Sequence, residues 1–242
     1  IYSQGFTSWF FLKEKEAGKL KVPVFVNFHG FEMFQKPPNL RVRAEYALLR
    51  KTVKWIVRRA DYVYSFGAQI DKIILDLVVR QDKIWLQSNG IQQNWLRDTE
   101  SDTDLRTFVF IGRNERRKGI EELNLALGDL LRDKSLEFKF HFIGPLPESV
   151  RLKDERILYH GEVRDSDKIR NLLDESDCLV CPSHSEGMPT VILEAMARGL
   201  AIIGTDVGAV SRQIDRNGIL LKSASPQLIL KALVDFLKLS DS

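Results

Sequence analysis

The sequence predicts an α/β fold in which parallel strands are wrapped by helices. The main sign is that strand and helix patterns alternate along the second half of the chain, from Phe108 to the end. A second sign is how two apolar strands end, one at Gly112 and the other at Gly144. Ligands of open α/β sheets bind beyond the carboxyl ends of the strands, so these two glycines indicate where a site would lie.

The elements of the second half follow one another at short intervals. Strands are expected before Gly112, before Gly144 and near Leu158, and a further apolar strand spans 178–181. Pro189 suits the first position of a helix, and Gly199 is a helix-ending signal. The last helix is expected over 226–239.

The first half has the same alternation in fewer elements. A buried strand ends near His29, a basic helix spans 41–60, and strands are expected at 61–65 and 83–87 around a helix at 68–79. The polar run that begins at Gln92 is the best linker. We therefore divide the chain into three parts: a partial N-terminal Rossmann-like domain (1–91), a linker (92–105) and a C-terminal Rossmann-like domain (106–242).

Composition excludes several classes of protein. Of the 242 residues 44% are hydrophobic and 29% are charged, which is ordinary for a globular protein, and the net charge of +3 is too small to argue for a nucleic-acid partner. No apolar run is long enough to span a bilayer, and no signal peptide pattern is present. Cys178 and Cys181 lie three residues apart in a strand and should point to opposite faces, so we expect buried, reduced thiols and a cytoplasmic location.

The most informative segment contains two glutamates. Glu186 lies in a polar loop with Gly187, and Glu194 lies on the helix that follows Pro189. Free backbone amides of this loop and helix start could hold an anion. The pattern suits a ligand with phosphate in the middle and hydroxyls at both ends, such as a nucleotide sugar. Taken alone, a glutamate in a loop or on a helix is usually a solvated surface charge, and it is the other segments that favour the binding site.

A cationic loop follows Gly112. Arg113 as a planar fork and Lys118 as a point charge could hold a diphosphate at the end of this strand. The alternative is a basic loop before a surface helix. We expect the neighbouring Arg116 and Arg117 to be solvated.

In this order, these segments resemble glycosyltransferase family 4, whose GT-B fold has two Rossmann-like domains of similar size. The resemblance rests on the glutamate pair with its flanks and on seven shorter matches: Asn89-Gly90-Ile91, Gly112-Arg113, Lys118-Gly119, Gly144, Gly161-Glu162-Val163, Pro182-Ser183 and Asn217-Gly218. Only the later half of the first domain is recognisable, so we expect a shortened chain.

The resemblance implies a role for each site residue. Glu194 would accept hydrogen bonds from ribose, Glu186 would face the donor sugar, and backbone near Gly144 and Val163 would meet the base. His29 would lie near the acceptor, although it could also be a loop histidine bonded to backbone. The expected catalytic set is His29, Glu186, Arg113 and Lys118; the expected donor-binding set is Gly112, Arg113, Lys118, Gly144, Val163, Glu186, Gly187, Met188, Pro189, Thr190 and Glu194.

No metal site is expected. The two Asp-x-Asp tripeptides are Asp102-Thr-Asp104, in the linker, and Asp165-Ser-Asp167, where Asp165 would cap a helix. Fixed cations and amides can neutralise a leaving diphosphate without a metal. We expect no cofactor apart from a UDP- or GDP-linked sugar donor.

The resemblance therefore implies a retaining, metal-independent glycosyltransferase of cell-surface polysaccharide or glycolipid synthesis, acting on a lipid-linked or saccharide acceptor. Two alternatives remain: a GT-B nucleotide-sugar epimerase, and a nucleotide-sugar-binding module without turnover. The basic helix 41–59 has the pattern of a surface-lying helix. It would place the protein at the inner face of the membrane, unless it is only a scaffold helix.

Overall fold

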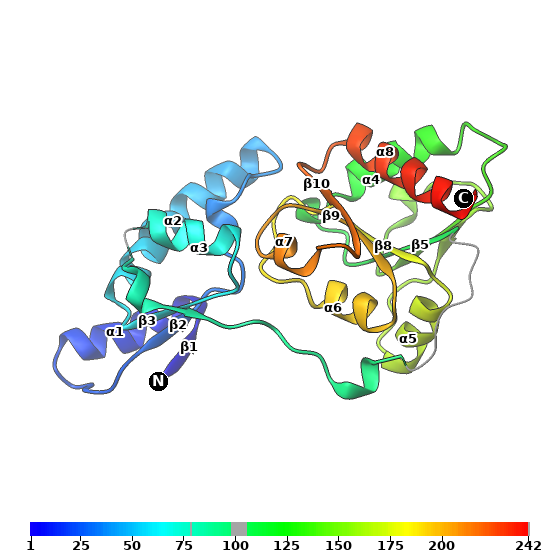
Figure 1. Ribbon diagram of the computed structural model, residues 1–242. Helices are drawn as coiled ribbons and strands as arrows, with labels where there is room; N and C mark the ends of the chain where they lie inside the picture. Colours follow the sequence, from blue (N-terminus) through cyan, green and yellow to red (C-terminus); the bar gives the residue numbers. More distant parts are fainter. Residues whose placement is uncertain (78, 98–105, 242) are drawn as a thin grey trace. The chain divides into compact units, whose positions relative to one another are not determined.

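The computed structural model describes residues 1–77, 79–97 and 106–241, in two compact units (Figure 1). The first unit comprises Ile1–Asn89 with two short segments, Ser185–Met188 and Val207–Arg212. The second comprises Gly90–His184, Pro189–Asp206 and Gln213–Ser242. Each unit contains one parallel sheet.

The first unit has a four-stranded sheet in the order β1-β2-β3-β4. Its strands are β1 (Tyr2–Gln4), β2 (Phe25–Asn27), β3 (Tyr62–Ser65) and β4 (Ile84–Leu86), and its helices are α1 (Ser8–Glu16), α2 (Leu40–Arg59) and α3 (Gln69–Asp76). All neighbouring strands are parallel. The strand, helix, strand, helix, strand order expected from 21 to 87 is therefore present.

Alternation along these strands separates two kinds of side chain. Val26 and Val63 are fully buried and belong to one apolar cluster with side chains of α1, α2 and α3. Their neighbours point to the other face, where the Phe25 and Tyr62 rings stack with centroids 4.6 Å apart and Trp85 packs edge-on against Tyr62. The period of two thus gives this sheet an aliphatic helix-covered face and an aromatic face.

Helix α2 is rich in basic residues, with seven arginines and lysines among its 20 residues. The Asn39 side chain caps it by accepting a hydrogen bond from the Val42 amide. Val53 and Ile56 are fully buried, whereas Leu40 and Leu48 are 80% and 79% exposed. Among the helices that the structure describes, none combines the length and apolarity needed to cross a bilayer.

The second unit has a six-stranded parallel sheet in the order β10-β9-β8-β5-β6-β7. The strands are β5 (Thr107–Ile111), β6 (Lys139–Ile143), β7 (Ile157–Tyr159), β8 (Cys178–Cys181), β9 (Ala201–Thr205) and β10 (Gly218–Leu221). The helices are α4 (Ile120–Leu130), α5 (Ser166–Asp174), α6 (Thr190–Ala197) and α8 (Pro226–Leu237), whereas α7 (Val210–Gln213) lies mostly in the Val207–Arg212 segment of the first unit. The α/β fold with parallel sheets is therefore confirmed.

Phenylalanines form the centre of the second unit. Phe108 and Phe110 of β5 and Phe140 and Phe142 of β6 are buried in one cluster with side chains of α4 and α8. Fully burying a side chain of this size contributes roughly 1.5–3 kcal/mol. These strands are buried on both faces, which explains why they read as nearly continuous apolar runs.

Three local expectations can be compared with the structure. Cys178 and Cys181 are buried and unbonded to one another, and burial raises the pKa of the Cys178 thiol far above its ordinary value. Asp165 caps α5 by accepting from the Asp167 amide, as expected. Helix α6 begins at Thr190, with Pro189 as its N-cap, one residue later than expected. Asp102, Asp104 and the linker residues 98–105 lie outside the described residues.

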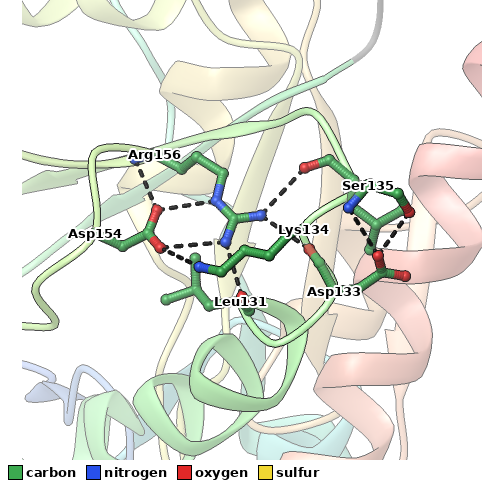
Figure 2. A network of polar contacts seen from close by, with 7 residues as sticks. Leu131, Asp133, Lys134, Ser135, Asp154 and Arg156 are labelled. Atoms are coloured by element: carbon green, nitrogen blue, oxygen red, sulfur yellow. Dashed lines mark hydrogen bonds and ion pairs between the residues drawn. The ribbon is translucent and has the colours of Figure 1, made fainter.

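One polar network supports the amino-terminal edge of the second sheet (Figure 2). The Arg156 guanidinium binds both carboxylate oxygens of Asp154, at 2.9 and 3.2 Å, and donates to the carbonyls of Leu131, Asp133 and Leu136. The hydrogen bonds from Arg156 stabilise the charged carboxylate of Asp154 and strongly lower the pKa of Asp154. The network holds the connection before β6 against the connection before β7.

Candidate functional site

The topology of the second unit defines one preferred place for a ligand. From β5 the chain proceeds to β6 and β7 on one side, and then to β8, β9 and β10 on the other. The strand order therefore reverses between β5 and β8. In open α/β sheets, ligands bind outside the carboxyl ends of the strands at such a switch point. The connections that follow β5 and β8 contain the Gly112–Lys118 loop and the start of the glutamate segment.

Two glycines permit the strand ends to approach closely. The Gly112 amide donates to the Ile143 carbonyl at 2.9 Å, and the Gly144 amide donates to the Gly161 carbonyl at 2.8 Å. Gly144 has φ +145°, and a Cβ there would lie 1.9 Å from the Gly112 carbonyl oxygen. The structure thus brings Gly112, Gly144 and the segment leading to Val163 together at one edge of the sheet.

Lys118 lies at this same edge. It ends a short 3-10 helix, Arg116–Lys118, and Gly119 follows in the left-handed region with φ +72°. A Cβ built on Gly112 would lie 3.9 Å from Lys118 Cδ, so the lysine side chain passes beside that glycine. The expected proximity of Lys118 to the end of β5 is therefore observed, while its contact with a diphosphate stays a prediction.

Arg113 is also placed after β5, but its charge is engaged. Its side chain is 73% exposed, and Nη2 lies 2.8 Å from Glu115 Oε1. Glu115 also binds Arg117, with its Oε2 2.8 Å from Nε. A bound diphosphate would have to compete with Glu115 for Arg113.

The expectation that Arg116 and Arg117 are solvated is wrong. Their side chains are only 26% and 27% exposed, and both are ion-paired. Arg116 makes two hydrogen bonds to Glu122, with Nη1 2.8 Å from Oε2 and Nη2 2.5 Å from Oε1. Burial is the largest single effect and raises the pKa of Glu122, but the hydrogen bonds from Arg116, a backbone hydrogen bond and His184 together outweigh it, so the net direction is down. The sequence signal for this pair was an acid in the first turn of the helix after a run of arginines.

Glu194 lies on α6, at the fifth residue of that helix. Its side chain is half-buried, and burial raises the pKa of the carboxyl above its ordinary value. Within the described residues no hydrogen bond or ion pair is made by this carboxylate. A partly desolvated acceptor without a donor is unfavourable, and such groups are over-represented at binding sites.

The loop Ser185–Met188 belongs to the first unit. Glu186 is 6% exposed there, and the Gln35 side chain binds its backbone twice: Nε2 donates to the Glu186 carbonyl at 2.6 Å, and Oε1 accepts from the Glu186 amide at 3.3 Å. Gly187 packs so closely that a Cβ would lie 1.5 Å from the His29 carbonyl oxygen. The structure therefore brings exposed His29 next to the glutamate loop, and it adds Gln35, which no sequence pattern indicated.

The remaining residues of the donor-binding set lie around the start of α6. The Met188 carbonyl accepts from the Asn89 side chain at 2.8 Å within the first unit. In the second unit, the Pro189 carbonyl accepts from Gln213 Nε2 at 3.1 Å, and Thr190 is exposed at the first helical position. Their predicted contacts with a donor remain predictions.

A separate cavity lies at the opposite ends of the strands. It has a volume of about 870 Å³ and is lined by residues at the amino ends of β5, β6 and β8, including Thr107, Lys139 and Asp177. None of the predicted site residues lines it. Its position at the amino ends of a parallel sheet is not where ligands of such sheets ordinarily bind.

Comparison with known proteins shows which sequences this chain resembles. A sequence profile described as "Glycosyl transferases group 1" matches residues 105–238. A protein named as a teichuronic acid biosynthesis glycosyltransferase, TuaC of Bacillus subtilis, is 37% identical over 134 residues, which cover 55% of this chain and 33% of that protein. The chain spans about a third to three fifths of the length of the curated relatives it matches.

Solved structures agree with the fold. Sucrose-phosphate synthase from Thermosynechococcus elongatus superposes with a TM-score of 0.80 and 17% identity, covering 100% of this chain and 65% of that one. Anabaena Alr3699/HepE in complex with UDP-glucose gives a TM-score of 0.74 at 16% identity, covering 100% and 69%. These similarities confirm the GT-B type of α/β fold expected from the sequence.

Proposed function

The chain belongs to the glycosyl transferases group 1 family, and from this premise we propose that it moves a sugar from a nucleotide-diphosphate donor to an acceptor. The observation that carries the proposal is the pair of connections beside the β5–β8 switch point. One contains Lys118, and the other leads through the glutamate loop to α6 and Glu194. A nucleotide sugar needs both a charge-neutralising group for its diphosphate and hydrogen-bond acceptors for its hydroxyls.

The leaving diphosphate gains negative charge as the glycosidic bond breaks. Lys118 beside Gly112 supplies a fixed positive charge, and Arg113 supplies a second one once the phosphate displaces Glu115. The amides of the first turn of α6 add partial positive charge. Such preorganised groups stabilise developing charge strongly because they need little reorganisation. They support transfer without a metal ion.

The carboxylates would read the two ends of the donor. Glu194 is acceptor-only and has no donor within the described residues, which suits the two hydroxyls of a ribose. Glu186, with its backbone held by Gln35, would face the donor sugar. Backbone near Gly144 and Val163 would meet the base, and His29 beside Gly187 would lie toward the acceptor.

Relatives suggest the type of donor and product. HepE was crystallised with UDP and with UDP-glucose, and TuaC is named for synthesis of teichuronic acid, a cell-surface polymer. By analogy, we propose a UDP- or GDP-linked donor and an acceptor that is a saccharide or lipid-linked saccharide of the cell surface. We also propose that the anomeric configuration is retained, as the resemblance to glycosyltransferase family 4 implies.

Helix α2 would bring the protein to a membrane that holds such an acceptor. Leu40, Leu48, Arg43, Lys51 and Lys54 recur at helical spacing on one side of the helix and are exposed. Basic and apolar residues on a shared face are typical of helices that lie in the membrane interface. Two cations of the same helix serve the fold instead, because Arg50 Nε donates to the Met33 carbonyl and Arg58 Nε to the Leu77 carbonyl.

Binding calorimetry with UDP, GDP and UDP-glucose tests the donor site. Glu194→Gln should weaken binding of the nucleotide diphosphate by about 1–3 kcal/mol, the scale of hydrogen bonds to a charged group. Glu186→Gln should weaken the binding of UDP-glucose and leave the binding of the nucleotide diphosphate unchanged. Glu137→Gln is the matched control, since that side chain is 87% exposed and lines the cavity at the opposite ends of the strands.

Equal affinities for wild type and both site variants would refute the carboxylate roles. Product analysis then separates the alternatives. A glycosylated acceptor supports the transferase, whereas an isomerised donor sugar indicates the epimerase. Tight nucleotide binding with neither product indicates a binding module.

A further inference from the structure

A cluster of three side chains joins the connections that follow β5 and β8. Arg116 comes from the 3-10 helix after β5, Glu122 from the first turn of α4, and His184 from the connection after β8. His184 Nε2 lies 3.0 Å from Arg116 Nη1 and 3.1 Å from Glu122 Oε1. The Glu122 and His184 side chains are each only 13% exposed. All three residues lie in the second unit.

Two backbone contacts tie the same connections together. The His184 amide donates to the Arg117 carbonyl at 2.7 Å. Gly119 packs against the residue after β8, because a Cβ at Gly119 would lie 1.9 Å from the Pro182 carbonyl oxygen. The side-chain cluster therefore links two connections whose backbones are already in contact. We call this contact between the connections after β5 and β8 the joint.

The chemistry of the cluster makes the joint rigid. Arg116 makes a bidentate contact with the Glu122 carboxylate, which fixes the guanidinium plane. His184 Nε2 is within reach of a donor and of an acceptor, so it can accept from Arg116 when unprotonated or donate to Glu122 when it carries a proton. Either form of the imidazole keeps a bond to the cluster.

We propose that Arg116, Glu122 and His184 form a positioning network that holds the two halves of the donor-diphosphate site in register. Lys118 is two residues beyond Arg116, and the connection that contains His184 leads along the chain to α6 and Glu194 of the same unit. The inference rests on the proposed function, because it assigns these loops to the binding of a nucleotide diphosphate. The three residues act through the loops and do not themselves touch the donor.

The first test measures affinity for UDP and GDP in folded variants. Glu122→Gln and His184→Leu should each weaken binding about 5- to 150-fold, the range expected for losing hydrogen bonds to a charged group. His184→Gln should stay within about threefold of wild type, because an amide can accept from Arg116 and donate to Glu122 at once. Glu121→Gln is the matched control, since its side chain is 67% exposed and contacts only Arg116 Nε within this cluster.

A second test observes the joint without nucleotide. Hydrogen exchange of the segments 113–119 and 182–184 should accelerate in Glu122→Gln and His184→Leu but not in His184→Gln or Glu121→Gln. The combined Glu122→Gln and His184→Leu change should cost less affinity than the product of the single effects, because both remove one network.

The outcomes separate the two claims. If the wild type binds neither UDP nor GDP while exchange responds as expected, the proposed function fails and the coupling of the loops stands. If the wild type binds nucleotide and His184→Leu and Glu122→Gln bind it equally well, the positioning network is refuted. Loss of binding in His184→Gln as severe as in His184→Leu would also refute it, since the hydrogen bonds would then be irrelevant.

Discussion

Acidification should destabilise this protein through His141. The His141 side chain lies on β6 and is 5% exposed, and its Nδ1 has no hydrogen-bond partner within the described residues. Its ring lies 5.0 Å from the ring of His160, with the Lys139 charge also acting on it. Burial, then the charges of His160 and Lys139, lower the pKa of His141 from 6.5 to about 4. The folded state therefore resists protonation of this imidazole.

The size and sign of the effect follow from linkage. Above pH 6.5 the imidazole is neutral in both states, so it causes no pH dependence. As the pH falls from 6.5 toward 4, the unfolded state binds a proton that the folded state does not, and stability declines. The difference between the two pKa values, at about 1.36 kcal/mol per unit, corresponds to about 3 kcal/mol. Below pH 4 this contribution levels off.

Urea unfolding between pH 7 and 4 measures the effect, with His141→Leu as the comparison. Leucine is apolar and of similar volume, so the variant should be folded at pH 7 and should lose less stability on acidification. The difference in unfolding free energy between variant and wild type should change by about 3 kcal/mol over this range. A difference that stays constant from pH 7 to 4 would refute the assignment. Any dependence of the unfolding free energy on pH that remains in His141→Leu should be smaller in the double variant His141→Leu, His160→Leu. Burial lowers the pKa of His160 as well.

Three further outcomes are expected. Gly144→Ala should destabilise the second unit by about 3 kcal/mol or more in thermal unfolding, since φ is +145° and the new methyl would meet a carbonyl oxygen. The control Gly161→Ala, with φ +68° and open space around the new methyl, should cost about 1 kcal/mol in the same assay. Nucleotide binding should survive excess chelator and weaken as salt rises, because the site relies on fixed cations; loss on chelation with recovery on added magnesium would contradict this. Anionic vesicles should bind the protein in flotation assays, by about 1 kcal/mol per cation, and the triple change Arg43→Gln, Lys51→Gln, Lys54→Gln should release it, whereas vesicles of neutral lipid serve as the control. Failure to bind even at low salt would make α2 a scaffold helix.

Much of the second unit was predictable because its signals are local. The strands at Phe108 and Phe140, the glycine at the end of each, and the helix between Pro189 and Gly199 all follow from short stretches of sequence. Boundaries moved by a residue where a cap and a first helical position look alike, as at Pro189. The resemblance carried by the glutamate segment led to the family that the comparisons then established.

Interactions between distant residues were not predictable. Arg116 reads as a solvated charge, because nothing in its neighbours along the chain indicates that His184 approaches from 68 residues away. Likewise, Gln35 is an unremarkable loop residue until the Glu186 backbone lies against it, 151 residues later in sequence.

The sequence alone determined the α/β class, the alternation of elements and the types of residue available to a donor site, because periodicity, capping and turn chemistry act over a few residues. Tertiary structure decided which strand ends adjoin, where the strand order reverses, and which charges are already paired. These depend on pairing β5 with both β6 and β8, which lie about 30 and 70 residues further along the chain, and such contacts leave no local pattern in the residues that make them.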